Sequence, residues 1–407
     1  MSTSTSMPSP TPDAASNLLV RVFNGVLIVT LDRPAALNAL SLDMVRELAL
    51  LLERARTDSR IAAVVLRGAG GKAFCAGGDV RMFYEVATNK SMQPEDAARQ
   101  GGWLPFFIHE YRLDYAIHTF PKPIVALMDG ITMGGGMGLA QGAALRVVTE
   151  RSKIAMPETR IGMLPDVGAT HFLARMPVEL ELYLGLTGVT LTGADALVAG
   201  LADLCVPASS LDGWEARLEN GWNSSPPVLD LLAGHWNSVS SPSLTALRDV
   251  FTPPGNVTPP SALTGQLPWI TRHFGERQSV PQIVETLRAD LAQDALPPEQ
   301  RHWLQTTLDA LTSHSPTMLA VTREALLRGR NMTLADSFRM EIGIVSRTIG
   351  EGDFCEGVRA HLIDKDHQPR WLPATLAEVD DARVRHYLTP PWEPHEHPLR
   401  TLVGETL

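Results

Sequence analysis

The sequence predicts an α/β protein in which strands alternate with helices around a largely parallel sheet. Between about residues 18 and 204, short β-branched apolar runs alternate with stretches whose apolar residues recur at helical spacing. After about residue 206 the strand-like runs stop, and helical patterns are joined by connections rich in Pro, Ser and Gly. These observations predict an α/β core followed by a mostly helical C-terminal extension.

Each element of the core has its own local signal. Residues 25–31 form a compact apolar run, and Asp32-Arg33-Pro34 turns the chain away from it. Ser41 is suited to cap a helix over residues 42–55, whose apolar side chains share one face. Buried strands are expected at residues 61–66 and 123–128, and glycines follow each of them.

The length of 407 residues predicts two to three packing units, at about 150 residues per domain. We divide the chain into a disordered Ser/Thr/Pro-rich tail (1–17), the core (18–206), a mostly helical region (207–388) and a second tail (389–407). The first basic residue is Arg21, and no pattern of a secretory signal or mitochondrial presequence precedes it. Three scattered cysteines form no disulfide framework, so we expect a reducing, cytoplasmic location.

The charge balance excludes some classes of partner. Lys plus Arg number 35 against 45 Asp plus Glu, a net charge of −10, which argues against a nucleic-acid groove and against attraction to anionic membranes. An anionic small ligand is still allowed, because local cations and oriented backbone N–H groups can hold one. Glycines 134, 138 and 142 have the spacing of a membrane-helix contact face, but their glycine-rich surroundings and Arg146 make membrane insertion unfavourable.

Several familiar site motifs are incomplete. Leu139 stands where the dinucleotide fingerprint needs its third glycine, and no glycine precedes Lys72 at the spacing of a phosphate-binding loop. His109-Glu110 resembles the start of a zinc-protease helix, but Leu113 occupies the position of the second histidine. The sequence therefore predicts no metal site and no nucleotide cofactor of these kinds.

Two Gly-rich turns, residues 73–79 and 130–138, each follow a predicted strand. Glycine lets the backbone approach a ligand closely, and the start of a helix leaves N–H groups without partners. If the turns converge, two N–H groups could bind one oxygen as an oxyanion hole, which stabilises negative charge on a carbonyl. Either turn taken alone is better explained by a structural role than by a functional one, because Gly-rich turns after strands are common.

Two carboxylates, Glu158 and Asp166, lie eight residues apart among apolar neighbours. In such surroundings the proton affinity of a carboxylate rises, and the group can act as a base or a nucleophile. The alternative is that Asp166 caps a helix over residues 166–175 and that Glu158 forms an ion pair.

Together these features resemble the crotonase superfamily, which has the enoyl-CoA hydratase/isomerase fold. The resemblance implies a crotonase (ClpP-like) core of repeated ββα units that forms two roughly perpendicular sheets, in place of the single sheet suggested by alternation alone. It also implies that an acyl-CoA thioester oxygen binds between the N–H groups of Gly78 and Gly135. The motifs that carry the resemblance are Asp32-Arg33-Pro34, residues 36–40 (ALNAL), 74–79 (FCAGGD) and 134–136 (GGG), and Pro157-Glu158.

Further motifs resemble the 3-hydroxyisobutyryl-CoA hydrolase branch of this superfamily. Hydratases of the superfamily carry a second catalytic glutamate three residues after the second oxyanion-hole glycine, where this chain has Gly138. That departure argues against the addition of water to a double bond. The motifs shared with the hydrolase branch are residues 130–136 (GITMGGG), 156–159 (MPET), 164–168 (LPDVG), 354–360 (FCEGVRA), 364–366 (DKD) and 369–371 (PRW).

The resemblance assigns a role to individual residues. Glu158 matches the catalytic glutamate, and Asp166 matches the aspartate that contacts the acyl hydroxyl. Gly135 matches an oxyanion-hole glycine, and Glu110 matches an acidic residue of the substrate pocket. Arg81 stands where a cation often lies near the CoA phosphates, although a surface salt bridge would explain it equally well.

These matches imply hydrolysis of 3-hydroxyisobutyryl-CoA to 3-hydroxyisobutyrate and CoA, a step of valine breakdown. No metal or redox cofactor is expected, since CoA enters as part of the substrate, and the expected partner is a small acyl-CoA. A homo-oligomer is compatible with the resemblance, because superfamily members often form trimers. Two alternatives stay open: hydration or isomerisation of an enoyl-CoA, and binding of CoA without catalysis.

Overall fold

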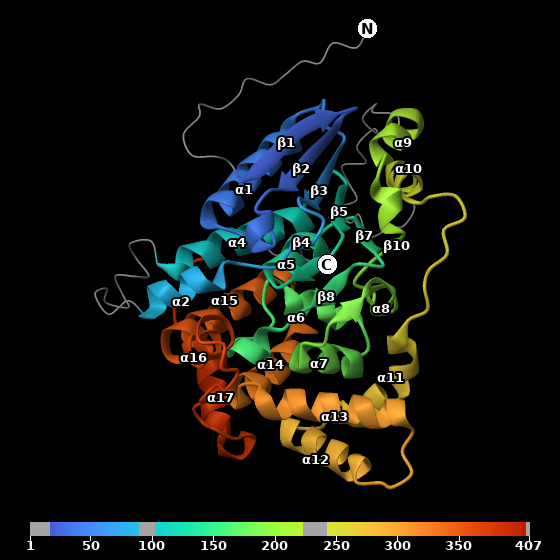
Figure 1. Cartoon of the computed structure of the whole chain (residues 1–407). Coiled ribbons are helices and arrows are strands. Elements are labelled where there is room, and N and C mark those ends of the chain that lie inside the picture. The colour runs from blue at the N-terminus through green and yellow to red at the C-terminus, as the bar shows by residue number, and fades with distance from the viewer. Residues whose placement is uncertain (1–16, 89–101, 223–241, 404–407) are drawn as a thin grey trace.

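The computed structural model describes residues 17–88, 102–222 and 242–403, and Figure 1 shows how their helices and strands are arranged. The predicted first tail, except for its last residue, lies outside the described residues, as do residues 404–407. Within the predicted second tail, Leu399 is fully buried, and its carbonyl oxygen accepts a hydrogen bond from Arg339. The division of the chain into domains stays a prediction.

The larger sheet has six strands within the described residues, in the order β1-β2-β3-β5-β7-β10. β1 pairs antiparallel with β2, and the strands from β2 onward are parallel. The parallel strands are mostly apolar because both faces are covered: Ile28 and Val65 belong to one apolar cluster, and Val29 and Leu66 to another. The strands are β1 (Leu18–Phe23), β2 (Val26–Leu31), β3 (Ala63–Gly68), β5 (Ile124–Met128), β7 (Leu145–Thr149) and β10 (Leu204–Val206).

The smaller sheet has the order β4-β6-β8-β9 and consists of β4 (Ala73–Cys75), β6 (Ile131–Met133), β8 (Lys153–Ala155) and β9 (Leu191–Thr192). Strands β4, β6 and β8 are parallel. The chain places β3, β5 and β7 in the larger sheet and follows each of them with one strand of the smaller sheet. The repeated ββα units are therefore confirmed, and the single sheet suggested by alternation alone is wrong.

The helices of the core are labelled in Figure 1. The predicted helix after Ser41 is confirmed: the Ser41 hydroxyl accepts a hydrogen bond from the N–H of Met44, as a capping residue does. No helix among the described residues is long and apolar enough to cross a membrane. The helices are α1 (Leu42–Thr57), α2 (Val80–Thr88), α4 (Trp103–His118), α5 (Gly135–Gln141), α6 (Ala169–Phe172), α7 (Val178–Thr187) and α8 (Gly193–Val198).

The predicted helical extension is confirmed, and it contacts both sides of the core. α9 (Trp214–Gly221) and α10 (Pro242–Phe251) cover the outer face of the larger sheet, where Trp214 joins the apolar cluster that contains Ile28. The later helices lie mostly at the end of the molecule away from β1 (Figure 1). They are α11 (Ala262–His273), α12 (Val280–Leu291), α13 (Pro298–Ser313), α14 (Pro316–Gly329), α15 (Leu334–Glu351), α16 (Phe354–Val358) and α17 (Asp381–Leu388).

Helix α15 ties this extension to the core, because it packs against both α4 and α6. Its Phe338 is fully buried, and the centre of its ring lies 5.4 Å from that of Tyr111 on α4. A Cβ placed on Gly168 would lie 3.1 Å from the same ring, so Phe338 fills the space directly beneath the turn before α6.

We expect Phe338→Ala to lower the free energy of unfolding by about 3–5 kcal/mol, because the truncation removes a buried ring and leaves a cavity between α15 and the core. Chemical denaturation measures the change. Val257→Ala is the matched control, since Val257 is 82% exposed and its truncation should alter stability by less than about 0.5 kcal/mol. Equal stability of the two variants would contradict this packing role.

Candidate active site

The candidate site lies where three neighbouring strands of the smaller sheet end. β4 runs into the turn at residues 76–79, β6 runs into Gly134 and α5, and β8 runs into Glu158 through two residues. Because β4, β6 and β8 are parallel and adjacent, their carboxyl ends meet at one edge of the sheet. The topology therefore brings together three segments that are spread between residues 76 and 158 of the chain.

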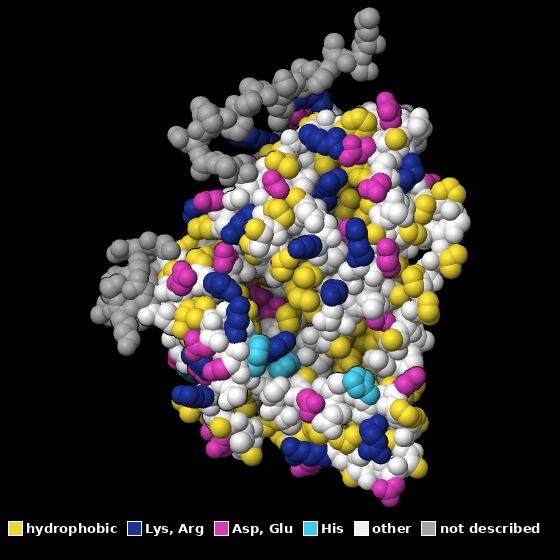
Figure 2. All heavy atoms as spheres, in the orientation of Figure 1, with side chains coloured by type: hydrophobic (Ala, Val, Ile, Leu, Met, Phe, Trp, Pro, Cys, Tyr) yellow, Lys and Arg dark blue, Asp and Glu magenta, His cyan; other side chains and the backbone are white. Residues whose placement is uncertain are grey.

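A cavity of about 240 Å³ opens at this edge. Its polar lining includes Glu110, Glu158 and Asp166, and its apolar wall includes Phe106 of α4 and Leu362 of the extension. Figure 2 shows a hollow in this face of the molecule, with acidic side chains in its depth and hydrophobic side chains around it. The structure thus brings the three predicted carboxylates into one pocket.

The two Gly-rich turns touch one another. Gly77 has φ +102°, and a Cβ placed there would lie 3.2 Å from the carbonyl oxygen of Met133 and 3.4 Å from the nitrogen of Gly135. The nitrogen of Gly78 would lie 3.4 Å from a Cβ on Gly135. In the part of the chain that the structure describes, no hydrogen bond uses the N–H of Gly78 or of Gly135. Both donors can therefore serve one oxygen in the cavity.

Glu158 begins a short 3-10 helix (Glu158–Ile161) and is only 6% exposed. Its Oε1 lies 3.1 Å from the position that a Cβ on Gly134 would take, and its Oε2 is buried without a hydrogen-bond partner. Burial, together with the nearby Asp166 carboxylate, raises the pKa of Glu158 well above its usual value. A carboxyl group therefore stands directly beside the turn that carries the Gly135 N–H.

Asp166 is 3% exposed, and its Oδ2 accepts a hydrogen bond of 2.5 Å from the hydroxyl of Tyr111. Burial raises the pKa of Asp166 to about 7, although the Tyr111 hydrogen bond opposes that rise. The alternative of a capping role is wrong: α6 begins at Ala169, and Gly168 is its cap residue. The helix predicted over residues 166–175 also begins later than expected, at Ala169, because the chain turns at residues 166–168.

A residue of the C-terminal extension holds the turn at residues 166–168 in place. Val167 has φ +53°, a conformation that a β-branched residue rarely adopts. The carboxyl group of Glu341, on α15, accepts hydrogen bonds from the N–H of Gly168 at 2.7 Å and of Thr170 at 2.9 Å, and from the Thr170 hydroxyl. Strained backbone of this kind persists only where surrounding contacts determine it. Glu341 therefore fixes the turn that carries Asp166.

The other two predicted residues occupy different surroundings. Glu110 is 2% exposed, and its Oε1 lies 2.3 Å from where a Cβ on Gly135 would be, so its carboxyl group packs against α5. Arg81 is exposed, does not line the cavity, and donates a hydrogen bond to the carbonyl oxygen of Leu362, which does. Arg81 therefore lies at the rim, and its role toward the CoA phosphates stays a proposal.

Sequence reasoning missed Tyr111 and Glu341. Tyr111 follows Glu110 directly, but adjacent helical residues face different directions, so the spacing gives no signal that its hydroxyl meets Asp166. Glu341 lies in the extension and is separated from Asp166 by more than 170 residues. Both contacts depend on tertiary packing, and no pattern of neighbouring residues could have identified them.

Comparisons with known proteins show which family this chain is similar to. A family model described as "Enoyl-CoA hydratase/isomerase" matches residues 26–388. The "3-hydroxyisobutyryl-CoA hydrolase, mitochondrial" of Gallus gallus is 36% identical over 93% of this chain and 90% of that protein. The human protein of the same name is 36% identical over 92% of this chain and 89% of its own length.

Solved structures with similar folds have different descriptions. A carnitinyl-CoA dehydratase from Mycobacterium thermoresistibile has a TM-score of 0.76 and 36% identity, covering 92% of this chain and 97% of that chain. An enoyl-CoA hydratase from Rhodobacter sphaeroides 2.4.1 has a TM-score of 0.76 and 35% identity, covering 92% and 98%. The fold is thus shared by proteins whose names describe hydrolysis, hydration and dehydration.

The raised pKa of Asp166 predicts a pH dependence of stability. Because the folded pKa of about 7 exceeds the ordinary 3.8, the folded state binds the extra proton, so this stabilisation is full below pH 4 and is lost as pH rises through 7. Asp166→Asn should therefore flatten the decline in the free energy of unfolding between pH 4 and 7, measured by denaturant titration.

The control is Asp58→Asn. The pKa of Asp58 is lowered from 3.8 to about 2, mainly by its hydrogen bonds with Arg60, so Asp58 is ionised in both states between about pH 5 and 7, the range in which the slopes of the two variants are compared. Its replacement should leave the slope unchanged. An unaltered slope in the Asp166 variant would show that Asp166 ionises as freely in the folded chain as in the unfolded one.

Proposed function

The chain belongs to the enoyl-CoA hydratase/isomerase family and, within it, to the branch of the 3-hydroxyisobutyryl-CoA hydrolases, and from this premise we propose that it hydrolyses 3-hydroxyisobutyryl-CoA. The products would be 3-hydroxyisobutyrate and CoA, as in valine breakdown. The observation that carries the proposal is the placement of two available backbone N–H donors and a buried carboxyl group around one cavity.

In the proposed mechanism, the thioester oxygen accepts hydrogen bonds from the N–H groups of Gly78 and Gly135. These donors stabilise the tetrahedral intermediate more than the substrate, because its oxygen carries the full negative charge. Glu158 then either attacks the carbonyl carbon to form a mixed anhydride or removes a proton from an attacking water. Its position beside Gly134 supports both routes equally.

Asp166 is proposed to bind the hydroxyl group of the acyl chain. Its carboxyl group faces the same cavity as Glu158, and Tyr111 fixes its orientation through the 2.5 Å hydrogen bond. A pKa of about 7 makes both its ionised and its protonated forms accessible near neutral pH, so it can accept a hydrogen bond from the hydroxyl or donate one to it. Glu110 lines the same cavity and completes its acidic side.

A second candidate function is hydration of an enoyl-CoA, because the two similar solved structures are described as a hydratase and a dehydratase. Gly138 argues against it. A Cβ placed on Gly138 would lie 2.6 Å from Oδ2 of Asp114 and 2.8 Å from Cβ of Val167, so the site has no room for a glutamate at that position. The carboxylate expected of a hydratase there is absent from this chain.

The proposed chemistry requires protein groups and water, with CoA as part of the substrate and no metal or redox cofactor. The cytoplasmic location and the homo-oligomer expected from the sequence stay predictions. Several hydrolases with similar sequences carry the word mitochondrial in their names, and that word describes those proteins.

Glu158→Gln should lower kcat for thiol release from 3-hydroxyisobutyryl-CoA by about 10²-fold or more, because the amide is neither a base nor a nucleophile. A thiol-trapping reagent measures the released CoA, and 3-hydroxypropionyl-CoA and crotonyl-CoA complete the panel. Glu285→Gln, an exposed change on α12, is the control and should keep wild-type activity. Loss of enoyl absorbance from crotonyl-CoA without thiol release would favour hydration.

Asp166→Asn should reduce the preference for a hydroxylated acyl group. The wild-type ratio of kcat/KM for 3-hydroxyisobutyryl-CoA to that for isobutyryl-CoA should fall by about tenfold, the effect of one hydrogen bond to a charged group. Measuring both substrates cancels any general loss of activity. An unchanged ratio would place the acyl hydroxyl away from Asp166.

A further inference from the structure

Three polar side chains follow one another along a single face of α4. Glu110, Asp114 and His118 are spaced four residues apart, so they lie on successive turns about 6 Å apart along the helix. Glu110 and Asp114 are 2% and 0% exposed. Oε1 of Glu110, both carboxyl oxygens of Asp114 and Nε2 of His118 are all buried without a hydrogen-bond partner among the described residues.

The glycines of α5 make room for this polar row. A Cβ on Gly135 would lie 2.3 Å from Oε1 of Glu110, and a Cβ on Gly138 would lie 2.6 Å from Oδ2 of Asp114. A Cβ on Gly142, just after α5, would lie 2.9 Å from the ring of His118. Each polar side chain of the row therefore rests on a glycine, and any larger residue at these positions would displace it.

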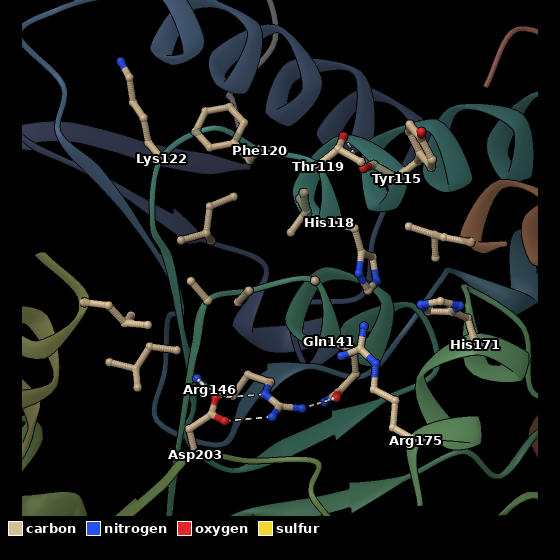
Figure 3. A pocket seen from close by; sticks show the side chains of 18 of the residues that line it. Tyr115, His118, Thr119, Phe120, Lys122, Gln141, Arg146, His171, Arg175 and Asp203 are labelled. Atoms are coloured by element: carbon tan, nitrogen blue, oxygen red, sulfur yellow. Dashed lines mark hydrogen bonds and ion pairs between the residues drawn. The ribbon is translucent and has the colours of Figure 1, made fainter. Parts of the chain in front are cut away.

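The two ends of the row lie in different cavities. Glu110 lines the candidate active site, whereas His118 lines a separate cavity of about 380 Å³ at the other end of α4. Figure 3 shows His118 in this second cavity together with His171 and Arg175, and the two histidine rings are 6.3 Å apart. Arg175 is exposed, so this end of the row reaches the surface of the molecule.

The proposed reaction needs an exit for a proton. Thioester hydrolysis consumes one water and yields a carboxylic acid and a thiol. The acid ionises at neutral pH, so each turnover releases one proton into a cavity filled by substrate and product. The carboxyl groups that line this cavity and can receive the proton are those of Glu158, Asp166 and Glu110.

We propose that Glu110, Asp114 and His118 form a path along which this proton leaves the active site for the second cavity. The path rests on the hydrolase function proposed above. Buried polar atoms without a protein partner are ordinarily bonded to ordered water, and a single water can bridge side chains one helical turn apart. The proton passes from the Glu110 carboxyl to that of Asp114, then to Nε2 of His118, and finally to solvent beside Arg175.

The charges around the path determine where the proton rests. The acidic groups Glu110, Asp166 and Glu341 surround Asp114, and burial together with these neighbours raises the pKa of Asp114, which therefore binds a proton readily. Burial and the nearby Arg175, His171 and Arg146 lower the pKa of His118 to about 3. His118 is therefore neutral at rest, and transfer of the proton from Asp114 to its Nε2 is energetically uphill, so this transfer is the slow step of the path and the protonated imidazole releases its proton at once.

Asp114 and His118 act through Glu110 and touch no reacting atom, so the test needs a readout that packing alone would not move. Asp114→Asn and His118→Gln should each lower kcat for thiol release by about tenfold, with KM within about twofold of wild type. The solvent deuterium isotope effect on kcat should increase in both, and added imidazole should restore part of the activity of His118→Gln.

His109→Gln is the matched control, because His109 lies on the same helix but outside the row. It should match wild type in kcat, isotope effect and response to imidazole. Circular dichroism checks the folding of each variant. If Asp114→Asn fails to fold, the kinetics of His118→Gln alone test the path. Wild-type kcat and isotope effect in His118→Gln would overturn the path while leaving the hydrolase function intact. Absence of thiol release by the wild-type chain would instead refute the proposed function itself.

Discussion

The hydrogen bonds that Glu341 accepts from the turn before α6 join the two parts of the molecule at its site. Val167 could not hold its positive φ without a partner for the backbone that follows it, and that partner comes from α15 rather than from the core. Asp166 and the wall of the cavity both depend on this turn. The extension therefore does more than cover the core: it determines the position of a carboxyl group in the site, and Leu362 of the extension lines the same cavity.

The second constraint is the burial of several carboxyl groups close together. Burial and repulsion between neighbouring carboxylates raise the pKa of Glu110, Asp114 and Glu158, whereas burial raises that of Asp166 to about 7 and that of Glu341 to about 8. Such groups cannot all be ionised at once, so near neutral pH the cluster shares protons. A site built in this way supplies both a base and an acid from carboxyl groups alone. The number of protons that the cluster binds can change by one during a reaction at little cost in free energy.

Much of this arrangement could be predicted from local patterns, and the failures have physical causes. Strands at residues 61–66 and 123–128 and the capped helix after Ser41 follow from local apolar periodicity, which the structure preserves. The division into two sheets came only from the resemblance, because alternation does not reveal which sheet a short strand joins. The start of α6 was misplaced because Asp166 has the residue type of a cap, whereas its side chain accepts a hydrogen bond from Tyr111, a contact made only in the folded chain.

The glycine at position 138 shows how one residue on α5 affects the position of a carboxyl group near the cavity. A hydratase of this family would place a carboxylate on α5, directed into the substrate cavity. Here α5 presents glycine, and the space beside it is taken by the carboxyl group of Asp114 from α4. The carboxyl group therefore stands on α4, behind the helix that faces the substrate. It belongs to Asp114, which lies between Glu110 and His118 along one face of α4. We do not expect a carboxyl group in that place to deliver a water molecule to a double bond, but it lies near Glu110, Asp166 and Glu341, so its charge affects how those groups bind protons.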